Sequence, residues 1–274
     1  MYCRNMSHNV NIFSPSHFNT MTPKKEKYYQ IASLEKGIRV LELLSNQNEM
    51  TVSSVATQLG FNRAASHRFL ATLRDLGYVD KNANNRYHLT FKIMEMGMKV
   101  ANRFEIRSAA RVYMQELSRA FGETVNLGYW KGQKIFHLDK IDSLEILRID
   151  TPLGSWAPAY CTALGKAILA YLPGDELEAY LKSTKLVSHA PNTITSKKIF
   201  RQELIKVLQQ GYAVDDEELS LGLRCVAAPV FDHTGHVRYA LSVSAPSSRM
   251  TQETIEKVQQ KLRDVCQRLT AKLR

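Results

Sequence analysis

The chain has 274 residues, of which 44% are hydrophobic, and its 37 Lys and Arg against 26 Asp and Glu give a formal net charge of +11. This length predicts two domains, and the basic balance favours a polyanionic partner such as nucleic acid. No apolar run approaches the roughly 20 residues of a membrane span, and nothing resembles a signal peptide. We therefore expect a cytoplasmic protein without a membrane partner.

A winged helix-turn-helix is predicted over residues 30–92, following residues 1–29, whose polar and aperiodic sequence predicts a disordered arm. Ser33 is expected to cap the first helix. That helix is expected to bury Leu34, Ile38, Leu41 and Leu44. Thr51 is expected to cap a second helix that ends at Gly60, where a tight turn between two helices requires a positive φ.

The third helix, which begins at Asn62, is interpreted as the recognition helix, because arginine and short polar groups near a helix N-terminus contact bases and phosphates. The turn-forming residues 82–85 lie between two short strand patterns and predict a hairpin, which would be the wing. The candidate DNA-binding residues are Asn62, Arg63, Ser66, His67, Arg68 and Arg74 on the helix and Arg86 on the wing. Two alternatives stay open: Arg68 could pair with Asp75, and His67 could be an ordinary surface histidine.

Residues 93–105 predict a linker helix, because their apolar positions recur at helical spacing. Residues 106–274 mix short strands with helices, which predicts an α+β domain with an antiparallel sheet. The expected helices span residues 106–121, 162–171, 175–181, 196–210 and 251–274. The expected strands span residues 125–130, 134–141, 144–149, 212–215, 225–231 and 237–244.

A second candidate binding segment is Pro158 to Lys166, which reads PAYCTALGK. Thr162 can cap the helix that follows, so the amides of Ala163 and Leu164 would lie in its first turn without intrahelical partners. Such amides and the helix dipole attract a carboxylate. From the residues alone, this interpretation is no better supported than a simpler one, in which Thr162 only caps a structural helix and Gly165 allows close packing.

Gly211 to Asp232 joins four consecutive acidic residues to an apolar strand with one cysteine. The pattern consists of Gly211, Asp215, Glu218, Cys225-Val226-Ala227 and Val230-Phe231-Asp232. This stretch resembles the signature of the IclR family of transcriptional regulators, and the resemblance implies a GAF-like effector-binding domain after the winged helix. Members of that family commonly carry a Ser-Thr pair where this chain has Ala64-Ala65, which puts the corresponding backbone contacts to DNA in doubt.

The resemblance also implies a ligand pocket in the C-terminal domain and a role for the linker helix in dimerisation. The residues that it places around the ligand are Ala163, Leu164, Asp215, Cys225, Ser242, Val243 and Ser244. Amides and serine hydroxyls can bind a carboxylate, whereas Asp215 would repel one and should accept from a ligand hydroxyl. We therefore expect a small organic acid as effector, a hydroxy- or oxo-carboxylate, with sugar acids and aromatic acids among the classes that the resemblance implies.

Other readings of the same residues are weighed against this one. Cys3, Cys161, Cys225 and Cys266 form no CxxC pair and no zinc-finger spacing, so we expect free thiols, no disulfide, no metal and no cofactor. Cys161, Asp215 and Cys225 could meet His137 or His189 at a metal, since sequence separation excludes nothing. A nucleophilic Cys225 would make the chain a redox sensor or a thiol enzyme, but it needs an activating base.

Taken together, the sequence predicts a DNA-binding regulator with no catalytic residues, whose operator affinity depends on a small acid. It should act as a dimer that places two recognition helices in successive major grooves, with a dimer of dimers as a larger assembly. The regulated genes would form a catabolic operon, by analogy with the family. The alternative from another class is a constitutive DNA-binding protein whose C-terminal domain only oligomerises.

Overall fold

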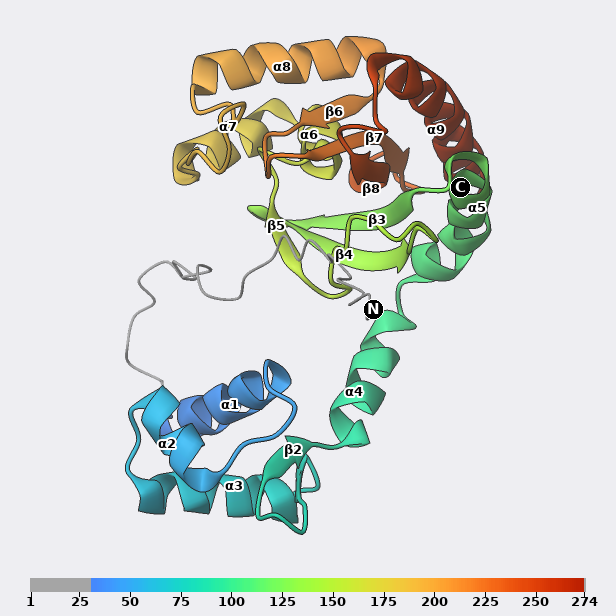
Figure 1. The fold of residues 1–274 in the computed structure, drawn as a ribbon. Helices are drawn as coiled ribbons and strands as arrows, with labels where there is room; N and C mark the ends of the chain where they lie inside the picture. The colour runs from blue at the N-terminus through green and yellow to red at the C-terminus, as the bar shows by residue number, and fades with distance from the viewer. Residues whose placement is uncertain (1–30, 274) are drawn as a thin grey trace, which may run out of the picture. The chain divides into compact units, whose positions relative to one another are not determined.

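The computed structural model describes residues 31–273, which form two compact units that divide between Arg103 and Phe104. Figure 1 shows the helices and strands of both units. The predicted arm, residues 1–29, lies outside the described residues. Within residues 31–273, none of the helices has the length and apolar character needed to cross a bilayer.

The N-terminal unit is a winged helix-turn-helix, as predicted. Its elements are α1 (Ala32–Ser45), α2 (Val52–Leu59), α3 (Arg63–Asp75), β1 (Val79–Lys81), β2 (Tyr87–Leu89) and α4 (Phe91–Ala101). The Thr51 side chain accepts a hydrogen bond from the Ser54 amide at 3.2 Å, and Gly60 ends α2 with φ of 67°. Asn62 caps α3 by accepting from the Ala65 amide at 2.7 Å. The side chains around the core are Val40, Leu44, Met50, Val55, Leu70, Leu73, Val79 and Tyr87.

The expected details of the first helix are partly wrong. Ile31 occupies the N-cap position of α1, and Ser33 lies inside the helix. Leu34 and Ile38 are exposed, whereas Val40 and Leu44 are buried. The reason is that only the C-terminal half of α1 packs on the core, so the apolar spacing of its first half does not mark a buried side.

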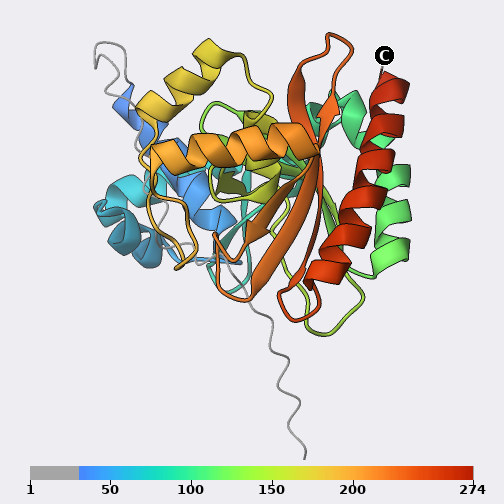
Figure 2. The ribbon, with the colours of Figure 1, turned by 90° about the horizontal axis from the view of Figure 1, so that it is seen from above.

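The C-terminal unit is a six-stranded antiparallel sheet in the order β5-β4-β3-β8-β7-β6, covered by helices on both faces (Figure 2). The strands are β3 (Thr124–Lys131), β4 (Lys134–Ile141), β5 (Trp156–Pro158), β6 (Ala213–Asp216), β7 (Leu223–Phe231) and β8 (Val237–Pro246). The helices are α5 (Glu105–Phe121), α6 (Ala163–Leu169), α7 (Gly174–Ser183), α8 (Lys197–Gln210) and α9 (Gln252–Leu273). The predicted α+β class and antiparallel sheet are confirmed.

Two cores hold the layers together. On one face of the sheet, α5 and α9 pack against side chains such as Leu127, Val226 and Val243. On the other face, α6, α7 and α8 pack against side chains such as Ile135 and Ala227. Because both faces are covered, β3 is buried along nearly its whole length and shows no alternation of polar and apolar residues.

The strand expected at residues 144–149 is absent from the described structure, and the sheet edge is formed by β5 instead. Leu144 and Ile146 are 99% and 84% exposed, so their apolar character does not mark a buried strand. Side-chain hydrogen bonds hold this loop: Ser143 donates to the Gly122 carbonyl at 2.6 Å and Thr124 donates to the Ile149 carbonyl at 3.0 Å. The loop therefore returns to the sheet at Ile149, close to the cavity described below.

Candidate DNA-binding surface and ligand cavity

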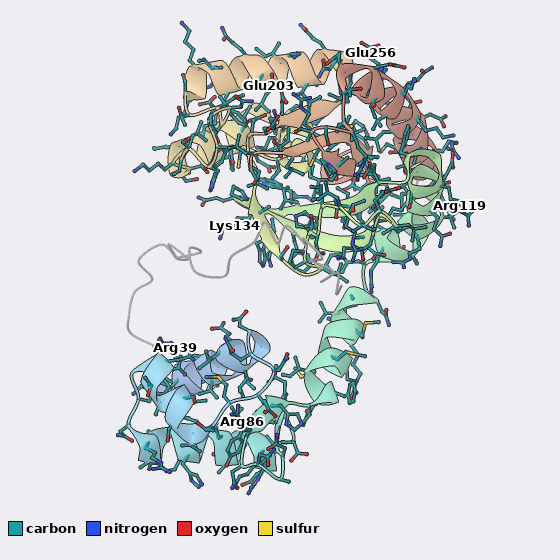
Figure 3. All side chains as sticks on the ribbon, in the orientation of Figure 1. Arg39, Arg86, Arg119, Lys134, Glu203 and Glu256 are labelled. Atoms are coloured by element: carbon teal, nitrogen blue, oxygen red, sulfur yellow. The ribbon has the colours of Figure 1, made fainter. Side chains whose placement is uncertain are left out.

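The exposed side of α3 carries Arg63, His67, Arg68 and Arg74 (Figure 3 shows the side chains of this unit). Within residues 31–273, neither Arg63 nor Arg68 forms an ion pair, and Arg74 approaches Asp75 at 3.8 Å. The expected alternative in which Arg68 pairs with Asp75 is therefore not what the structure shows. A helix face with unpaired arginines near its N-terminus is suited to phosphate and base contacts.

Three of the predicted DNA-binding residues have other contacts. Ser66 is wrong as a surface residue: it is fully buried and its hydroxyl donates to the Asn62 carbonyl at 3.1 Å. It shares the inner side of α3 with Leu70 and Leu73, at i, i+4 and i+7. Asn62 is exposed, but its Oδ1 caps the helix. Arg86 of the wing approaches Glu49, in the loop between α1 and α2, at 3.5 Å.

A cavity with about 410 Å³ of empty space lies between the sheet and α6 in the C-terminal unit. Its walls include six of the predicted effector residues, Ala163, Leu164, Asp215, Cys225, Ser242 and Ser244. The other residues along its walls are Asn126, His137, Ile149, Thr151, Thr162, Leu219 and Leu223.

The strand register explains why residues far apart in sequence meet at this cavity. Asp215 on β6 pairs with Cys225 on β7, and Cys225 pairs with Ser244 on β8. Since side chains directly opposite each other share a face of the sheet, these three line up as one row. Ser242 lies two residues from Ser244 on the same face and pairs with Asn126 on β3.

The Val243 side chain does not line the cavity, contrary to the expectation. Val243 lies between Ser242 and Ser244 on β8, so its side chain points to the opposite face of the sheet. There it is fully buried in the core formed with α5 and α9. Its role is to hold the sheet on those helices, and its neighbours supply the cavity hydroxyls.

Three buried polar atoms on the cavity residues have no hydrogen-bond partner within residues 31–273. They are Asn126 Oδ1, His137 Nδ1 and Asp215 Oδ2. An unpartnered polar atom in a protein interior costs roughly 1–3 kcal/mol, so native proteins rarely collect several at one place. Three such atoms lie on the residues of this one cavity.

The electrostatics of the cavity favour neutral groups. Burial and the neighbouring Glu218 carboxylate raise the pKa of Asp215 to about 7. Burial and the charge of Lys140 lower the pKa of His137 to about 4, so its imidazole is neutral at physiological pH. Burial also raises the pKa of the Cys225 thiol far above its ordinary value. The cavity therefore offers few fixed negative charges to repel an anionic ligand.

The helix that faces the sheet presents its N-terminus to the cavity. Thr162 caps α6 by accepting from the Gly165 amide at 3.2 Å, and Ala163 and Leu164 lie in the first turn beside the cavity. A Cβ on Gly165 would lie 2.0 Å from the Ala159 carbonyl oxygen, so only glycine fits there. The expected cap and the close packing at Gly165 are confirmed, and the first residues of the helix lie on the cavity wall.

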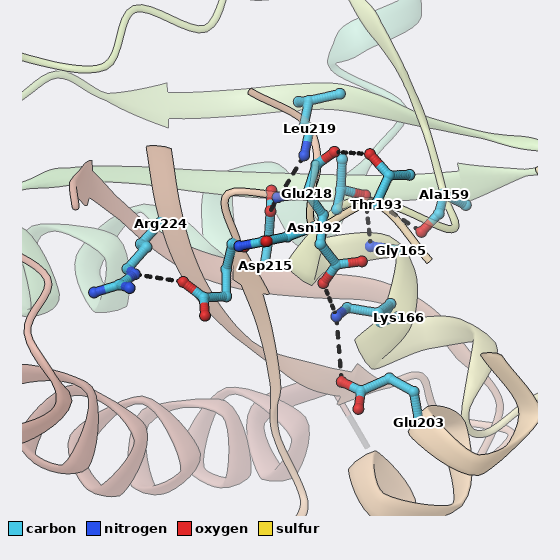
Figure 4. Close-up of polar contacts among 12 residues, drawn as sticks. Ala159, Gly165, Lys166, Asn192, Thr193, Glu203, Asp215, Glu218, Leu219 and Arg224 are labelled. Atoms are coloured by element: carbon cyan, nitrogen blue, oxygen red, sulfur yellow. Dashed lines mark hydrogen bonds and ion pairs between the residues drawn. The ribbon is translucent and has the colours of Figure 1, made fainter. Parts of the chain in front are cut away.

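Glu218 is not the solvated residue that its place in an acidic run suggests. It is buried and forms an ion pair with Lys166 of α6, which is itself fully buried (Figure 4). Lys166 also approaches Glu203 of α8 at 3.2 Å. Burial alone would lower the pKa of Lys166, but Glu218 and Glu203 outweigh it and keep the amine charged.

The same turn fixes Asp215. The amide of Glu218 donates to Asp215 Oδ1 at 2.8 Å, and the Glu218 carbonyl accepts from the Thr193 hydroxyl at 2.6 Å (Figure 4). One oxygen of Asp215 is therefore held by the backbone while the other remains available to the cavity. Asp216 and Glu217 are on the outer side, where both approach Arg224.

The metal and thiol readings gain no geometric support. No group of three His, Cys, Asp or Glu side chains able to hold a metal ion occurs in residues 31–273. Burial raises the pKa of Cys161 as well as that of Cys225, which disfavours the thiolate that a nucleophile or a metal ligand requires. The His189 ring lies 6.0 Å from the Tyr160 ring, between centroids and tilted by 34°, and His189 is outside the residues that form the cavity wall.

Sequence reasoning missed Asn126 as a cavity residue and considered His137 only as a metal ligand. Both are polar residues within largely apolar strands, which makes them unusual, but the sequence alone does not show which face of the sheet they occupy. The aromatic residues Trp130, Trp156 and Tyr160, which would favour an aromatic ligand, lie outside the cavity wall.

The chain matches known families over most of its length. Residues 33–83 match the profile of the IclR helix-turn-helix domain, and residues 98–271 match that of the bacterial transcriptional regulator IclR C-terminal domain. The HTH-type transcriptional regulator KdgR of Escherichia coli is 32% identical over 244 residues, covering 89% of this chain and 93% of KdgR. XynR of Escherichia coli is 34% identical over 222 residues, covering 80% of this chain and 88% of XynR.

Solved structures share the fold. Thermotoga maritima IclR matches with a TM-score of 0.80 and 32% identity, covering 89% of this chain and 99% of that protein. An IclR homolog from Microbacterium hydrocarbonoxydans, solved in complex with 4-hydroxybenzoate, matches with a TM-score of 0.77 at 20% identity. That match covers 88% of this chain and 98% of the homolog, and it shows the fold alone.

The buried ion pair predicts a specific stability effect. Replacing Glu218 with Leu leaves Lys166 buried with Glu203 alone, so we expect a loss of about 3 kcal/mol in the free energy of unfolding. The double variant Lys166→Met, Glu218→Leu should recover much of that loss, because both fully buried charges are gone and only the partly exposed Glu203 loses its partner. Urea unfolding followed by tryptophan fluorescence measures the free energy of unfolding of both variants, since both tryptophans, Trp130 and Trp156, lie in the C-terminal unit.

The matched control is Glu178→Leu, which removes the fully exposed partner of Arg201. This variant should unfold at the wild-type urea concentration, because exposed ion pairs contribute little. Equal effects of Glu178→Leu and Glu218→Leu would show that the buried pair has no special role.

Proposed function

The chain belongs to the IclR family of bacterial transcriptional regulators, and we propose that its affinity for operator DNA is controlled by a small organic acid bound in the C-terminal cavity. The observation that carries the proposal is the set of unpartnered polar atoms on Asn126, His137 and Asp215 within one cavity. Family membership makes the chain a regulator rather than an enzyme, and the raised thiol pKa of Cys225 agrees with that.

The proposed DNA reader is the exposed face of α3. Arg63, His67 and Arg68 follow the helix N-terminus, and the two arginines are without ion-pair partners in residues 31–273. The N-terminal residues of a recognition helix contact base edges in the major groove, and neighbouring basic residues contact phosphates. Arg74 and the wing residue Arg86 complete the proposed surface, and we leave Ser66 out because it is buried.

Self-association is proposed through the N-terminal unit, with residues 93–105 as the linker. No side chain of α4, Phe91–Ala101, is buried within its own unit, although the helix is largely apolar. Its exposed large apolar side chains are Phe91, Met94, Met96, Met98 and Val100. An apolar helix that stays uncovered in one copy supports a dimer, which would place two recognition helices on a roughly palindromic site. A dimer of dimers is the proposed larger assembly.

The proposed acid binds with its carboxylate near the first turn of α6. The amides of Ala163 and Leu164 are in that turn, and a helix N-terminus favours a negative charge. Ser242 and Ser244 add hydroxyl groups on the opposite wall. The 4-hydroxybenzoate in the Microbacterium homolog is a carboxylic acid that also carries a hydroxyl, which agrees with this class of ligand.

Control of DNA binding requires that the acid bind one arrangement of the dimer more tightly than another. A ligand that prefers one arrangement about 100-fold shifts the equilibrium by about 2.7 kcal/mol. A constitutive DNA-binding protein with an oligomerisation domain needs no cavity, and the unpartnered buried atoms count against that alternative. The proposed targets are the genes of a catabolic operon.

Arg68→Ala tests the proposed DNA reader. The variant should bind an operator selected in vitro from the host genome about 10-fold more weakly than the wild type. The slope of log affinity against log salt concentration should become shallower by about one, which corresponds to one lost phosphate contact. Arg119→Ala, which removes an exposed arginine of α5 in the C-terminal unit, is the control and should bind normally. Fluorescence anisotropy at several salt concentrations measures both. Unchanged operator affinity in Arg68→Ala would contradict the assignment of α3.

A thermal-shift screen against small organic acids tests the proposed cavity. An acid present at 100 times its dissociation constant should stabilise the protein by about 2.7 kcal/mol, because it binds the native state only. Asp215→Ala should lose that shift while retaining operator affinity without acid. A wild-type shift that persists in Asp215→Ala would place the binding site elsewhere.

A further inference from the structure

A groove lies at the edge of the sheet in the C-terminal unit, beyond the end of β6 and apart from the ligand cavity. β6 pairs with β7 only as far as Ala213 opposite Ala227, so residues 228–231 of β7 have β8 on one side and no strand on the other. This edge groove holds about 1120 Å³ of empty space, part of it open to solvent. Its walls come from the end of β7, from α9, and from Tyr171 and Gly211, and none of these residues lines the cavity.

The edge groove is poorly suited to an added strand. A strand that pairs with a sheet edge needs free backbone amides along that edge. Pro229 has no amide hydrogen, and the Phe231 amide already donates to Thr270 Oγ1 at 3.1 Å. The open side of β7 therefore lacks the donors that a peptide strand requires, and the groove is better suited to a small molecule.

Arg263 of α9 gives the edge groove its charge. The residues that the described structure places along the groove include this arginine and neither Asp, Glu nor Lys. Within residues 31–273, Arg263 has no ion-pair partner, and its Nη1 donates to Gln259 Oε1 at 3.4 Å. Arg268 of the same helix, by contrast, pairs with Glu116 and Asp264. The unpaired guanidinium has further N–H donors, so the groove favours an anion.

Two contacts place the guanidinium at the groove wall. A Cβ on Gly211 would lie 3.3 Å from Arg263 Nε, so the glycine allows the guanidinium to lie close to the backbone at the end of α8. Burial raises the pKa of Tyr171, and the nearby charge of Arg263 opposes that increase. The Arg263 side chain is therefore near both Gly211 and Tyr171.

An apolar surface lies beside this cation. The Tyr171 and Phe231 rings meet edge to face, with their centroids 5.3 Å apart. Ala228 and Ala271 add small apolar groups to the same walls. A guanidinium can bind a carboxylate through two parallel hydrogen bonds, and aromatic side chains favour a flat apolar body. The groove thus combines one anion-binding group with a surface for a ring.

We infer that the edge groove is a second binding site, which takes a small aromatic carboxylate with its charge on Arg263 and its ring against Tyr171 and Phe231. The site is separate from the ligand cavity and does not depend on the acid control proposed above. β7 connects the two, since Cys225 lines the cavity and Phe231 lines the groove. A ligand in the groove therefore contacts the same strand as a ligand in the cavity.

Methyl NMR of the full-length chain, labelled at its alanine methyl groups, tests this inference with benzoate as the probe. Ala228 and Ala271 line the groove, whereas Ala163 lines the cavity, so their signals distinguish the two sites. Benzoate should shift the Ala228 and Ala271 signals in a saturable way. Benzamide lacks the charge and acetate lacks the ring, so each should bind at the groove about 10-fold more weakly than benzoate, or weaker still.

Variants at exposed positions of α9 locate the site. Arg263→Gln removes the charge, so benzoate affinity at the groove should fall about 10-fold or more. Ala271→Trp fills the groove and should abolish the benzoate shift of Ala228. Arg268→Gln is the matched control, because it removes an arginine of the same helix outside the groove, and it should leave the affinity unchanged.

The outcomes separate the groove from the cavity. Saturable shifts of Ala228 and Ala271 that Arg263→Gln weakens and Arg268→Gln retains support the inference. The absence of these shifts, equal shifts with benzamide, or unchanged affinity in Arg263→Gln overturns it. A benzoate shift of Ala163 alone also overturns it and leaves the proposed acid control in place. Asp215→Ala should retain the groove shifts, so failure of the cavity proposal would not remove them.

Discussion

A buried ion pair between Lys166 and Glu218 joins the two segments that form the ligand cavity. Lys166 belongs to α6, whose first turn faces the cavity, and Glu218 belongs to the turn that holds Asp215. Because both charges are buried, neither can be lost alone without a large cost. The pair therefore fixes the helix N-terminus opposite the sheet, and the position of the remaining cavity groups depends on it.

The strand register does the rest of the positioning. Asp215, Cys225 and Ser244 come from three strands, and their direct pairing gives one row of polar groups on the cavity face of the sheet. Gly165 lets α6 approach that face, since any side chain there would overlap the Ala159 backbone. The result is a small cavity with hydroxyls, neutral titratable groups and helix amides, but few fixed charges.

Local signals in the sequence were enough for the elements and for part of the cavity. Thr51 and Asn62 cap helices as their residue types predict, and Asp215 and Cys225 are found together as the signature stretch implies. Two errors could have been avoided from periodicity alone. Ser66 shares the helical repeat of buried leucines, and Val243 alternates with two serines that face the other way.

Other features depend on tertiary structure and could not be read from the sequence. The partner of Glu218 is 52 residues away, so an acidic run gave no hint of a buried carboxylate. Asn126 lies on β3, which is covered by helices on both faces. An alternation of polar and apolar residues therefore does not show which of its side chains face the cavity and which face the core with α5 and α9. Leu144 and Ile146 have the residue types of a strand, but both side chains are exposed. Hydrogen bonds donated by Ser143 and Thr124 hold this segment as a loop, and the sequence does not show them.

The central claim is that acid binding and operator binding are coupled in this chain, and reciprocal titration tests it most directly. Operator affinity would be measured with and without a saturating acid, and acid affinity with and without saturating operator. Thermodynamic linkage predicts the same factor in both directions, and a value of about 5–150 would be typical of allosteric coupling. If an acid that binds the cavity changes operator affinity by a factor of one, and operator changes acid affinity by a factor of one, the two sites are not coupled and the claim is contradicted.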